Sequence, residues 1–335
     1  MINWIKLISS LSMVFVFYIF GYTNPVKDAE SIFDLMGGEE IIKLTIDIDL
    51  DSVIAQRRKD ETLATSVSFT DKEGQPYTLD VKLAMRGRFR RGHCSVPPLK
   101  LDFKKKDLED NGLARFDDYK LVTHCVSDMK SAKELIIREY LAYKMYNELT
   151  KYSYRVQLVQ ITYRSPNTGK EDEQWGFLIE DTSELSARLG LEKLDYMALS
   201  KDSIQTQSLK VVSVFQKMIG NPDWGIDPTK NVKYFRKEGK IILVAYDFDF
   251  SLFVDAPYAE ATRKVSDANL APVPDQYTNL HPEVFGNSIS GTISYFQSKR
   301  KELVTIIKEC KVLPGRIRSE MVGTLAIFYR EILEL

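Results

Sequence analysis

The sequence predicts an α+β fold in which a β-rich first part is followed by a mainly helical second part. Runs such as Ile41 to Leu50 and Tyr77 to Met85 alternate apolar and polar residues, which is typical of half-buried strands. Lys130 to Leu149 instead has apolar residues at spacings of four, which predicts a long helix. Helical spacing returns in Ile293 to Cys310 and Ile317 to Leu335. We therefore expect an antiparallel sheet with one long helix packed on it, and helical support after it.

Length and composition limit the class of protein. The chain has 335 residues, of which 44% are apolar, enough to bury one large core or two lobes that share a cleft. It carries 46 Lys and Arg against 47 Asp and Glu, so it lacks the overall positive field with which proteins bind nucleic acid. No internal repeat or low-complexity segment is visible. A disordered, repeat or nucleic-acid-binding protein is therefore disfavoured.

The first 25 residues form a segment of their own. Lys6 precedes an uncharged run whose apolar centre extends from Leu11 to Phe20, the pattern of a signal peptide. We therefore expect export from the cytoplasm. The stretch from Gly21 to Asn24 is a poor cleavage site, so the alternative is an uncleaved anchor that attaches the protein to the membrane through residues 5–22.

The three cysteines bear on the compartment. Cys94 and Cys125 lie in neighbouring predicted strands and can form one disulfide outside the cytoplasm, with Cys310 buried on a helix. Two buried free thiols are the alternative. Zinc bound by both cysteines and the preceding His93 and His124 is disfavoured, because adjacent residues of a strand point in opposite directions.

A helix, a loop and a hairpin follow one another in the second half. Helical spacing from Gln205 to Ile219 ends at Gly220, a natural C-cap. Residues 221–231 contain Asn, Pro, Gly and Asp, which is typical of a loop. Val232 to Phe235 and Ile241 to Tyr246 are β-rich runs that predict a hairpin. The Asp-Phe-Asp sequence that follows therefore leaves an apolar strand directly.

Four polar residues of this segment are candidates for a functional site. A carboxylate at the end of an apolar strand needs a cation or hydrogen-bond donors if it is buried. Magnesium prefers carboxylate and amide oxygens, so Asp247, Asp249 and Asn231 are candidate metal ligands. Asp223 can instead accept a hydroxyl proton or orient a nucleophile. Protein kinases use acid, amide and acid in this order, whereas ordinary turns and a solvated strand edge are the alternative.

Six short segments, within a stretch of about half the chain, form a series. They are Met85–Arg91, Pro97–Phe103, Ile137–Tyr143, Phe177–Glu180, Met218–Trp224 and Tyr246–Ser251. In this order they resemble the CotH-type atypical protein kinases, the spore-coat kinase family, and most closely its envelope members from Gram-negative bacteria.

The resemblance implies a bilobal fold distantly similar to that of protein kinases. Residues 30–180 would form the N-lobe and residues 181–335 the C-lobe, with the catalytic loop at 221–231 and the metal-binding step at 247–249. Glu180 would begin the connection between the lobes, beside the nucleotide. The implied activity is transfer of the terminal phosphoryl group of ATP, with magnesium or manganese, to Ser or Thr hydroxyls of an unidentified protein substrate in the periplasm.

The family pattern also assigns roles to single residues. Asp223 would be the catalytic-loop acid and Asp247 the metal-binding acid, and Lys100 is the candidate phosphate-binding lysine. In kinases a helix acid pairs with that lysine, a role for Glu134 or Glu139 here, with a simple surface ion pair as the alternative.

Basic residues take the place of a glycine-rich phosphate loop. No G-x-G-x-x-G motif precedes Lys100. Arg86, Arg88 and Arg90 alternate, so they would share one face of a strand, and guanidinium groups bind phosphate in a bidentate fork. We therefore expect Arg86 and Arg88 to bind the nucleotide phosphates. For Lys104 to Lys106 a solvated basic edge is an equal alternative.

Two other functions fit the same residues. ATP is scarce outside the cytoplasm, so an exported kinase needs exported nucleotide or another phosphoryl donor. One alternative is a catalytically inactive envelope module whose acidic cluster binds a divalent metal structurally. The other is transfer of AMP on the same scaffold.

Overall fold

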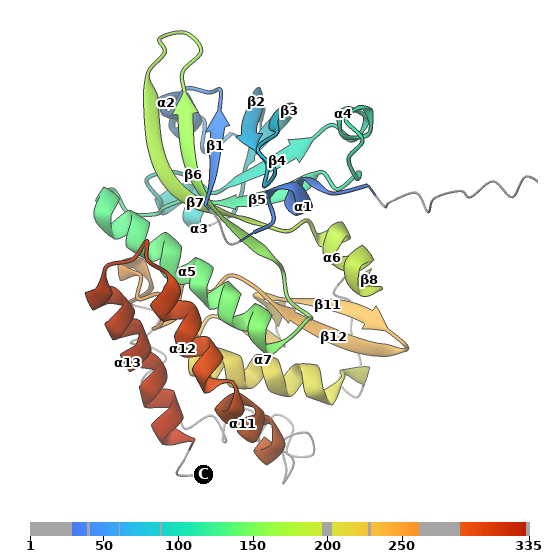
Figure 1. Cartoon of the computed structure of the whole chain (residues 1–335), viewed down its shortest axis with the longest axis vertical. Coiled ribbons are helices and arrows are strands. Elements are labelled where there is room, and N and C mark those ends of the chain that lie inside the picture. Colours follow the sequence, from blue (N-terminus) through green and yellow to red (C-terminus); the bar gives the residue numbers. More distant parts are fainter. Residues whose placement is uncertain are drawn as a thin grey trace, which may run out of the picture.

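A closed β-barrel forms the first part of the fold (Figure 1). The computed structural model describes residues 29–38, 41–59, 61–87, 89–195, 203–226, 229–260 and 289–332. Within these residues the barrel strands follow the order β1-β2-β3-β4-β5-β7-β6. Their bounds are Ile42–Ile46 (β1), Thr62–Thr70 (β2), Pro76–Met85 (β3), Leu99–Phe103 (β4), Asp118–Val122 (β5), Val156–Arg164 (β6) and Glu171–Ile179 (β7).

The closure of the barrel corrects the expected sheet. All neighbouring strands are antiparallel except β1 and β6, whose parallel pairing joins the two edges. The expected antiparallel pairing is therefore confirmed for six of the seven strand pairs and is wrong for β1 and β6. Alternation along a strand records only which face is buried, and it is the same in an open sheet and in a barrel.

Alternate side chains of each strand fill the barrel. In β4 the buried residues are Leu99, Leu101 and Phe103, whereas Lys100 and Asp102 face outward, as the sequence predicts. Three short helices pack around the strands: α1 (Ile32–Met36), α2 (Leu50–Ala55) and α4 (Lys105–Asp110). The outward face of β4 and β5 therefore carries charged residues.

The long helix α5 (Met129–Leu149) lies between the barrel and the C-terminal helices (Figure 1). Its prediction is confirmed to within one residue. The Asp128 side chain caps it by accepting a hydrogen bond from the Ser131 N–H at 2.9 Å. One side of α5 packs on β7 and another on α12 (Arg300–Glu309).

The second part combines helices with a small sheet. Helix α7 (Thr206–Met218) and the hairpin of β11 (Val232–Lys237) and β12 (Lys240–Ala245) confirm the predicted helix and hairpin. The remaining elements are α6 (Thr182–Leu189), β8 (Glu192–Leu194), β9 (Gly225–Ile226), β10 (Thr229–Lys230), a 3-10 helix at Pro257–Ala259, α11 (Ile289–Ser298) and α13 (Gly315–Glu331). Strand β8 pairs with β11.

The expected single helix from Ile293 to Cys310 is two helices. Helix α11 ends at Ser298 and α12 begins at Arg300, with Lys299 in a turn between them. The two helices pack on different partners, α11 on α7 and α12 on α5, which requires a change of direction.

Two large hydrophobic cores meet at strand β7. Leu178 belongs to the core inside the barrel, and its neighbour Phe177 belongs to the core around α5, α7 and α12. This follows from the alternation of side chains along a strand. The two-lobe division at residue 180 stays a prediction.

No helix in the described ranges is both long and apolar enough to span a bilayer. The expected signal peptide or anchor, residues 1–25, lies outside the described residues.

A buried charge network joins the barrel to α6. The guanidinium of Arg155 contacts the carboxylates of Asp34 at 2.7 Å, Glu180 at 2.9 Å and Glu184 at 2.5 Å. Arg188 donates a second set of hydrogen bonds to Glu180. Burial, together with the nearby charge of Glu180, raises the pKa of Glu184 to about 7 from its usual 4.5, although Arg155 opposes the shift.

The raised pKa of Glu184 predicts a pH dependence of stability. The folded-state pKa lies above the unfolded one, so this stabilisation is fully present below about pH 4.5 and is lost as the pH rises through about 7. Glu184→Gln should reduce the fall of the unfolding free energy across this window, by at most about 3 kcal/mol. Denaturant unfolding at a series of pH values measures it. The exposed Glu192→Gln should keep the wild-type slope, and an equal slope in Glu184→Gln would contradict the prediction.

Candidate functional site

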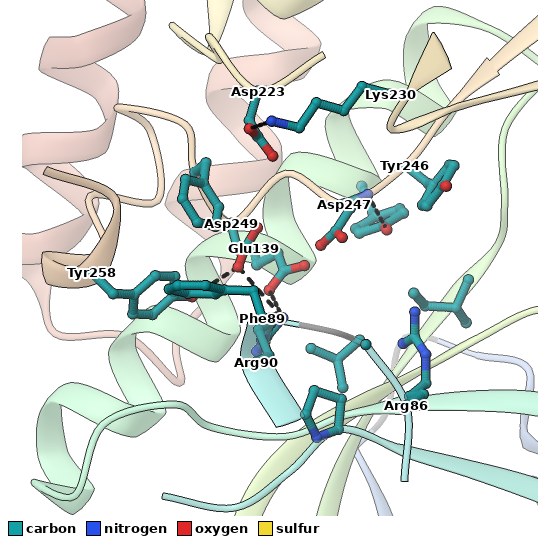
Figure 2. A pocket seen from close by; sticks show the side chains of 16 residues that line it. Arg86, Phe89, Arg90, Glu139, Asp223, Lys230, Tyr246, Asp247, Asp249 and Tyr258 are labelled. Carbon is teal, nitrogen blue, oxygen red and sulfur yellow. Dashed lines mark hydrogen bonds and ion pairs between the residues drawn. The ribbon is translucent and has the colours of Figure 1, made fainter. Parts of the chain in front are cut away.

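A cavity of about 500 Å³ lies between the barrel and the second part (Figure 2). Its walls come from the end of β3, the helix after it, α5, the loop after α7 and the Asp-Phe-Asp step. The polar and aromatic residues among its lining are Arg86, Phe89, Arg90, Glu139, Tyr143, Asp223, Lys230, Tyr246, Asp247, Asp249, Phe250 and Tyr258.

Gly220 and Asn221 determine the conformation of the loop after α7. Gly220 has a φ of 61°, and a Cβ atom there would lie 2.8 Å from the Leu252 side chain, so glycine is favoured at this position. The Asn221 side chain accepts a hydrogen bond from the Asp223 N–H at 3.0 Å and donates one to Gln216 at 2.9 Å. These contacts hold Asp223 at the cavity with 9% of its surface exposed.

Asp223 and Asn231 are in direct contact, although they are eight positions apart in the chain. The Asn231 side-chain amide donates to the Asp223 carbonyl at 2.7 Å and to its carboxylate at 2.9 Å. Lys230 forms an ion pair with the other carboxylate oxygen of Asp223. The sequence reasoning missed Lys230, and its place directly before Asn231 was the available signal.

The Asp-Phe-Asp step is a sharp bend and not a continued strand. Asp247 has a left-handed φ of 64°, and its N–H donates to the Tyr143 hydroxyl at 2.8 Å. Phe248 is fully buried, with its ring 4.6 Å from that of Tyr143 and 5.2 Å from that of Phe215. Because Phe248 anchors the bend in the core, Asp247 and Asp249 both face the cavity (Figure 2).

A buried arginine holds two of the acids. Arg90 Nη1 lies 3.4 Å from Glu139 Oε2 and 3.7 Å from Asp249 Oδ2, and the Arg90 side chain is 11% exposed. Tyr258 donates a further hydrogen bond to Asp249 at 3.1 Å. Glu139 comes from α5, so of the two helix acids considered, Glu139 reaches the cavity. Its partner is Arg90 and not Lys100.

The position of Arg90 differs from the expected one, in which Arg86, Arg88 and Arg90 share one face of a strand. Strand β3 ends at Met85, and Phe89–His93 forms a short helix, α3, that carries Arg90. The predicted alternation on one strand face is therefore wrong for Arg90. Arg86 does line the cavity. Arg88 lies outside the described residues.

The carboxylates around Arg90 carry more negative charge than its guanidinium balances. Burial raises the pKa of Glu139 to about 7, and burial together with the Asp247 charge raises that of Asp249. Burial alone would lower the pKa of Arg90, but Tyr258, Glu139 and Asp249 raise it. One guanidinium therefore faces three carboxylates, and the excess negative charge suits a cation beside Asp247.

The donor set fits magnesium better than a fully protein-coordinated metal. No group of three or more His, Cys, Asp or Glu side chains in the described ranges is placed to hold a metal ion. Magnesium is commonly held by one or two protein oxygens, with water and phosphate completing its shell. The Tyr246 N–H donates to the Asn231 carbonyl at 3.1 Å, which places Asp247 and Asn231 at the same end of the β11-β12 hairpin. Asp249 is instead engaged by Arg90 and Tyr258.

Two predicted cofactor-binding residues lie outside the cavity. Lys100 is on the outer face of the barrel, 3.4 Å from Asp118 and 3.8 Å from Asp102. Glu180 is fully buried, and both its carboxylate oxygens accept hydrogen bonds from Arg155 and Arg188. The structure therefore places neither of them in the cavity lining, because ion pairs engage Lys100 with Asp102 and Asp118, and Glu180 with Arg155 and Arg188.

Two other lysines, Lys120 on β5 and Lys233 on β11, lie next to the cavity residue Tyr246. The sequence reasoning missed them. Each belongs to a short apolar strand, and only strand pairing reveals that both approach the same tyrosine.

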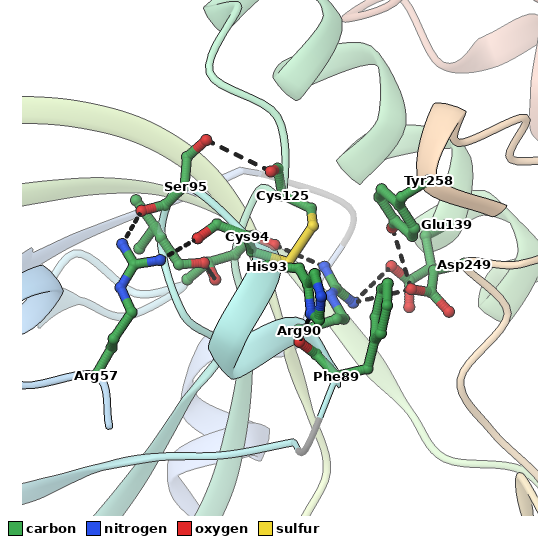
Figure 3. Close-up of a disulfide and its surroundings, with 12 residues drawn as sticks. Arg57, Phe89, Arg90, His93, Cys94, Ser95, Cys125, Glu139, Asp249 and Tyr258 are labelled. Carbon is green, nitrogen blue, oxygen red and sulfur yellow. Dashed lines mark hydrogen bonds and ion pairs between the residues drawn. A yellow bond between two sulfur atoms is a disulfide. The ribbon is translucent and has the colours of Figure 1, made fainter. Parts of the chain in front are cut away.

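A disulfide fixes the helix that carries Arg90 (Figure 3). Cys94 follows α3 directly and is bonded to Cys125, in the segment between β5 and α5. Arg57 donates hydrogen bonds to the carbonyls of Cys94 at 2.6 Å and Ser95 at 2.8 Å. The alternatives of two free thiols and of a zinc site are therefore wrong. Cys310 is a free, partly buried thiol.

Comparisons with known proteins return distant structural similarities. The chain is similar to the proinflammatory kinase CtkA of Helicobacter pylori, with a TM-score of 0.38 and 10% identity over 71% of this chain and 89% of that one. It is also similar to the Rio2 kinase of Chaetomium thermophilum in its complex with ADP, Mg²⁺ and phosphoaspartate, with a TM-score of 0.31 and 11% identity over 84% of this chain and 75% of that one. No protein-family model and no curated protein matches the sequence. Similarities of this size do not assign the chain to a family.

Removal of the disulfide should destabilise the protein. Cys94→Ser opens a covalent loop between residues 31 positions apart, which should lower the unfolding free energy by about 2–5 kcal/mol. Denaturant unfolding without reductant measures the loss. Cys310→Ser keeps the disulfide and should stay close to wild type, whereas equal stability of Cys94→Ser and wild type would contradict the structure.

Proposed function

We propose that this protein is a kinase-like phosphotransferase that transfers the terminal phosphoryl group of Mg-ATP to hydroxyl groups of a protein substrate. The observation that carries the proposal is the meeting of Asp223, Asn231 and Asp247 at one cavity. Acid, amide and acid serve in this order in protein kinases, where the first acts on the acceptor hydroxyl and the others hold metal. The buried pair of Arg90 with Glu139 is consistent with the lysine–glutamate pair that a kinase helix makes.

The residues would divide the reaction between them. Asp247 and Asn231 would hold the magnesium ion, which when bound neutralises charge on the donor phosphates. Asp223 would orient the acceptor hydroxyl and take its proton as the oxygen forms the new P–O bond. The bond between the terminal phosphorus and the bridging oxygen breaks, and ADP leaves with the electron pair. Arg86, at the cavity wall, would contact the phosphates.

Phe89, Phe250 and Tyr258 would form an acceptor platform at the cavity. Phe89 is 42% exposed, and its ring lies 5.7 Å from Phe250 and 6.3 Å from Tyr258. Exposed aromatic rings of this kind supply contact area with little loss of side-chain entropy. We propose that they contact the protein substrate.

We also propose that the protein works outside the cytoplasm, in the periplasm or anchored to the membrane and facing it. The Cys94–Cys125 disulfide supports this location, because disulfides persist in oxidising compartments. The apolar run after Lys6 supports it independently.

A structural metal module is the second candidate function. Both carboxylate oxygens of Asp223 are engaged, one by Lys230 and the other by Asn231. Two engaged oxygens leave less of the carboxylate free to accept a hydrogen bond from an acceptor hydroxyl. This observation favours a site that binds a cation without catalysis.

Labelled nucleotide separates the candidates. The full chain is incubated with Mg²⁺, a carrier protein and ATP labelled on the α or the γ phosphate. We expect label from γ alone, reduced about a thousandfold or more in Asp247→Asn and in Asp223→Asn, at unchanged folding stability. The exposed Asp110→Asn of α4 is the matched control and should transfer normally. Label from α would indicate AMP transfer, and normal transfer by Asp247→Asn would refute the assigned roles.

Magnesium should stabilise the wild-type protein through Asp247. At a concentration about tenfold above the dissociation constant, the binding adds about 1.4 kcal/mol to the unfolding free energy. We expect the increase in melting temperature on adding Mg²⁺ to disappear in Asp247→Asn and to persist in Asp110→Asn. An equal increase in all three proteins would place the ion elsewhere.

A further inference from the structure

Two lysine ammonium groups share the same two aromatic rings beside the cavity. Lys120 Nζ lies 5.4 Å from the centroid of the Tyr154 ring and 5.5 Å from that of Tyr246. Lys233 Nζ lies 5.6 Å and 5.8 Å from the same two centroids. The two positive groups, called the lysine pair below, are therefore close together although β5 and β11 belong to different sheets.

No carboxylate in the described part of the chain forms an ion pair with either lysine. Lys233 Nζ donates to the Thr182 hydroxyl at 3.0 Å, a neutral partner. Asp118, the acid whose charge acts on both lysines, is itself 3.4 Å from Lys100. Burial and the nearby Lys233 lower the pKa of Lys120 well below its usual range, and burial lowers that of Lys233. Among the described residues the lysine pair therefore lacks a carboxylate in direct contact.

The lysine pair lies beside the cavity. Tyr246, which lies against both ammonium groups, lines the cavity directly before Asp247. On β5, Val122 lies two residues after Lys120 on the same strand face and also lines the cavity. Arg86 lines the cavity, and Figure 2 shows its guanidinium on the Tyr246 side of the site. Arg86 and the adjacent lysine pair thus place positive charge near Tyr246.

The lysine pair suits phosphate oxygens. The rings of the fully buried Tyr154 and of Tyr246 are engaged by the two ammonium groups. Ammonium and guanidinium groups without carboxylate partners among the described residues are suited to the oxygens of phosphate groups.

We propose that the lysine pair binds the phosphate groups of the donor, so that a polyphosphate chain is sufficient for its recognition. The proposal rests on the phosphotransferase function proposed above and names its donor class. Inorganic tripolyphosphate should then replace ATP. The acceptor hydroxyl oxygen bonds to the terminal phosphorus, its bond to the bridging oxygen breaks, pyrophosphate leaves with the electron pair, and the proton goes to Asp223.

Donor competition tests the proposal. Transfer to a carrier protein is measured with ATP, GTP, CTP and tripolyphosphate, each labelled on its terminal phosphate. We expect the four values of kcat/KM to agree within about threefold, because the lysine pair contacts the phosphate chain that all four donors share. Lys120→Met and Lys233→Met should each raise KM for every donor about tenfold or more, the loss of one charge-assisted contact. Lys82→Met, on the exposed outer face of β3, is the matched control and should leave KM unchanged.

The outcomes separate this proposal from the function on which it rests. Transfer from ATP about a hundredfold better than from the other donors, with both lysine variants unaffected, would overturn it and leave a kinase. If no donor supports transfer, calorimetric titration of tripolyphosphate into the full chain decides. If wild type binds tripolyphosphate and both lysine variants do not, the phosphate site is upheld. If wild type does not bind it, the proposal is overturned. Melting temperatures equal to wild type confirm that the variants are folded.

Discussion

The contact of Arg90 with Glu139 and Asp249 holds the candidate site together. It joins three elements that are distant in the chain: the short helix after β3, the long helix α5 and the acidic bend after β12. The pair partners are 3% and 2% exposed, so loss of the guanidinium would leave buried carboxylates without a counter-charge. The Cys94–Cys125 disulfide adds a covalent constraint at the end of the same short helix. The position of both walls of the cavity therefore depends on one buried cation.

The acidic end of the cavity is built by backbone geometry around an aromatic anchor. Asn231 and Asp247 both have positive φ values, 52° and 64°, a backbone conformation that residues other than glycine rarely adopt. Such strain is sustained only where the surroundings fix it, and it is often found at functional sites. Here Phe248, buried between Tyr143 and Phe215, supplies that support. The bend turns an alternating Asp-Phe-Asp sequence into two acids that face one cavity.

Acids in the cavity and cations beside it form a charge pattern that suits an extended anion bound with a metal ion. Arg90 forms ion pairs with Glu139 and Asp249, and the nearby Asp247 adds a third carboxylate, which leaves excess negative charge. Next to the cavity residue Tyr246, Lys120 and Lys233 share two tyrosine rings without a carboxylate partner among the described residues. A phosphate chain would contact these ammonium groups and the metal ion, and both would contribute to its orientation.

The sequence by itself determined the local elements and the acid–amide–acid set, because periodicity, turn chemistry and strand ends are encoded in neighbouring residues. It thus predicted α5, α7, the β11-β12 hairpin and the grouping of Asp223 with Asn231. Only the tertiary structure decided the closure of the barrel, the choice of Arg90 over Lys100 and the meeting of Lys120 with Lys233. The physical reason is that alternation reports which face of a strand is buried, whereas strand pairing and helix packing decide which distant side chains share a space.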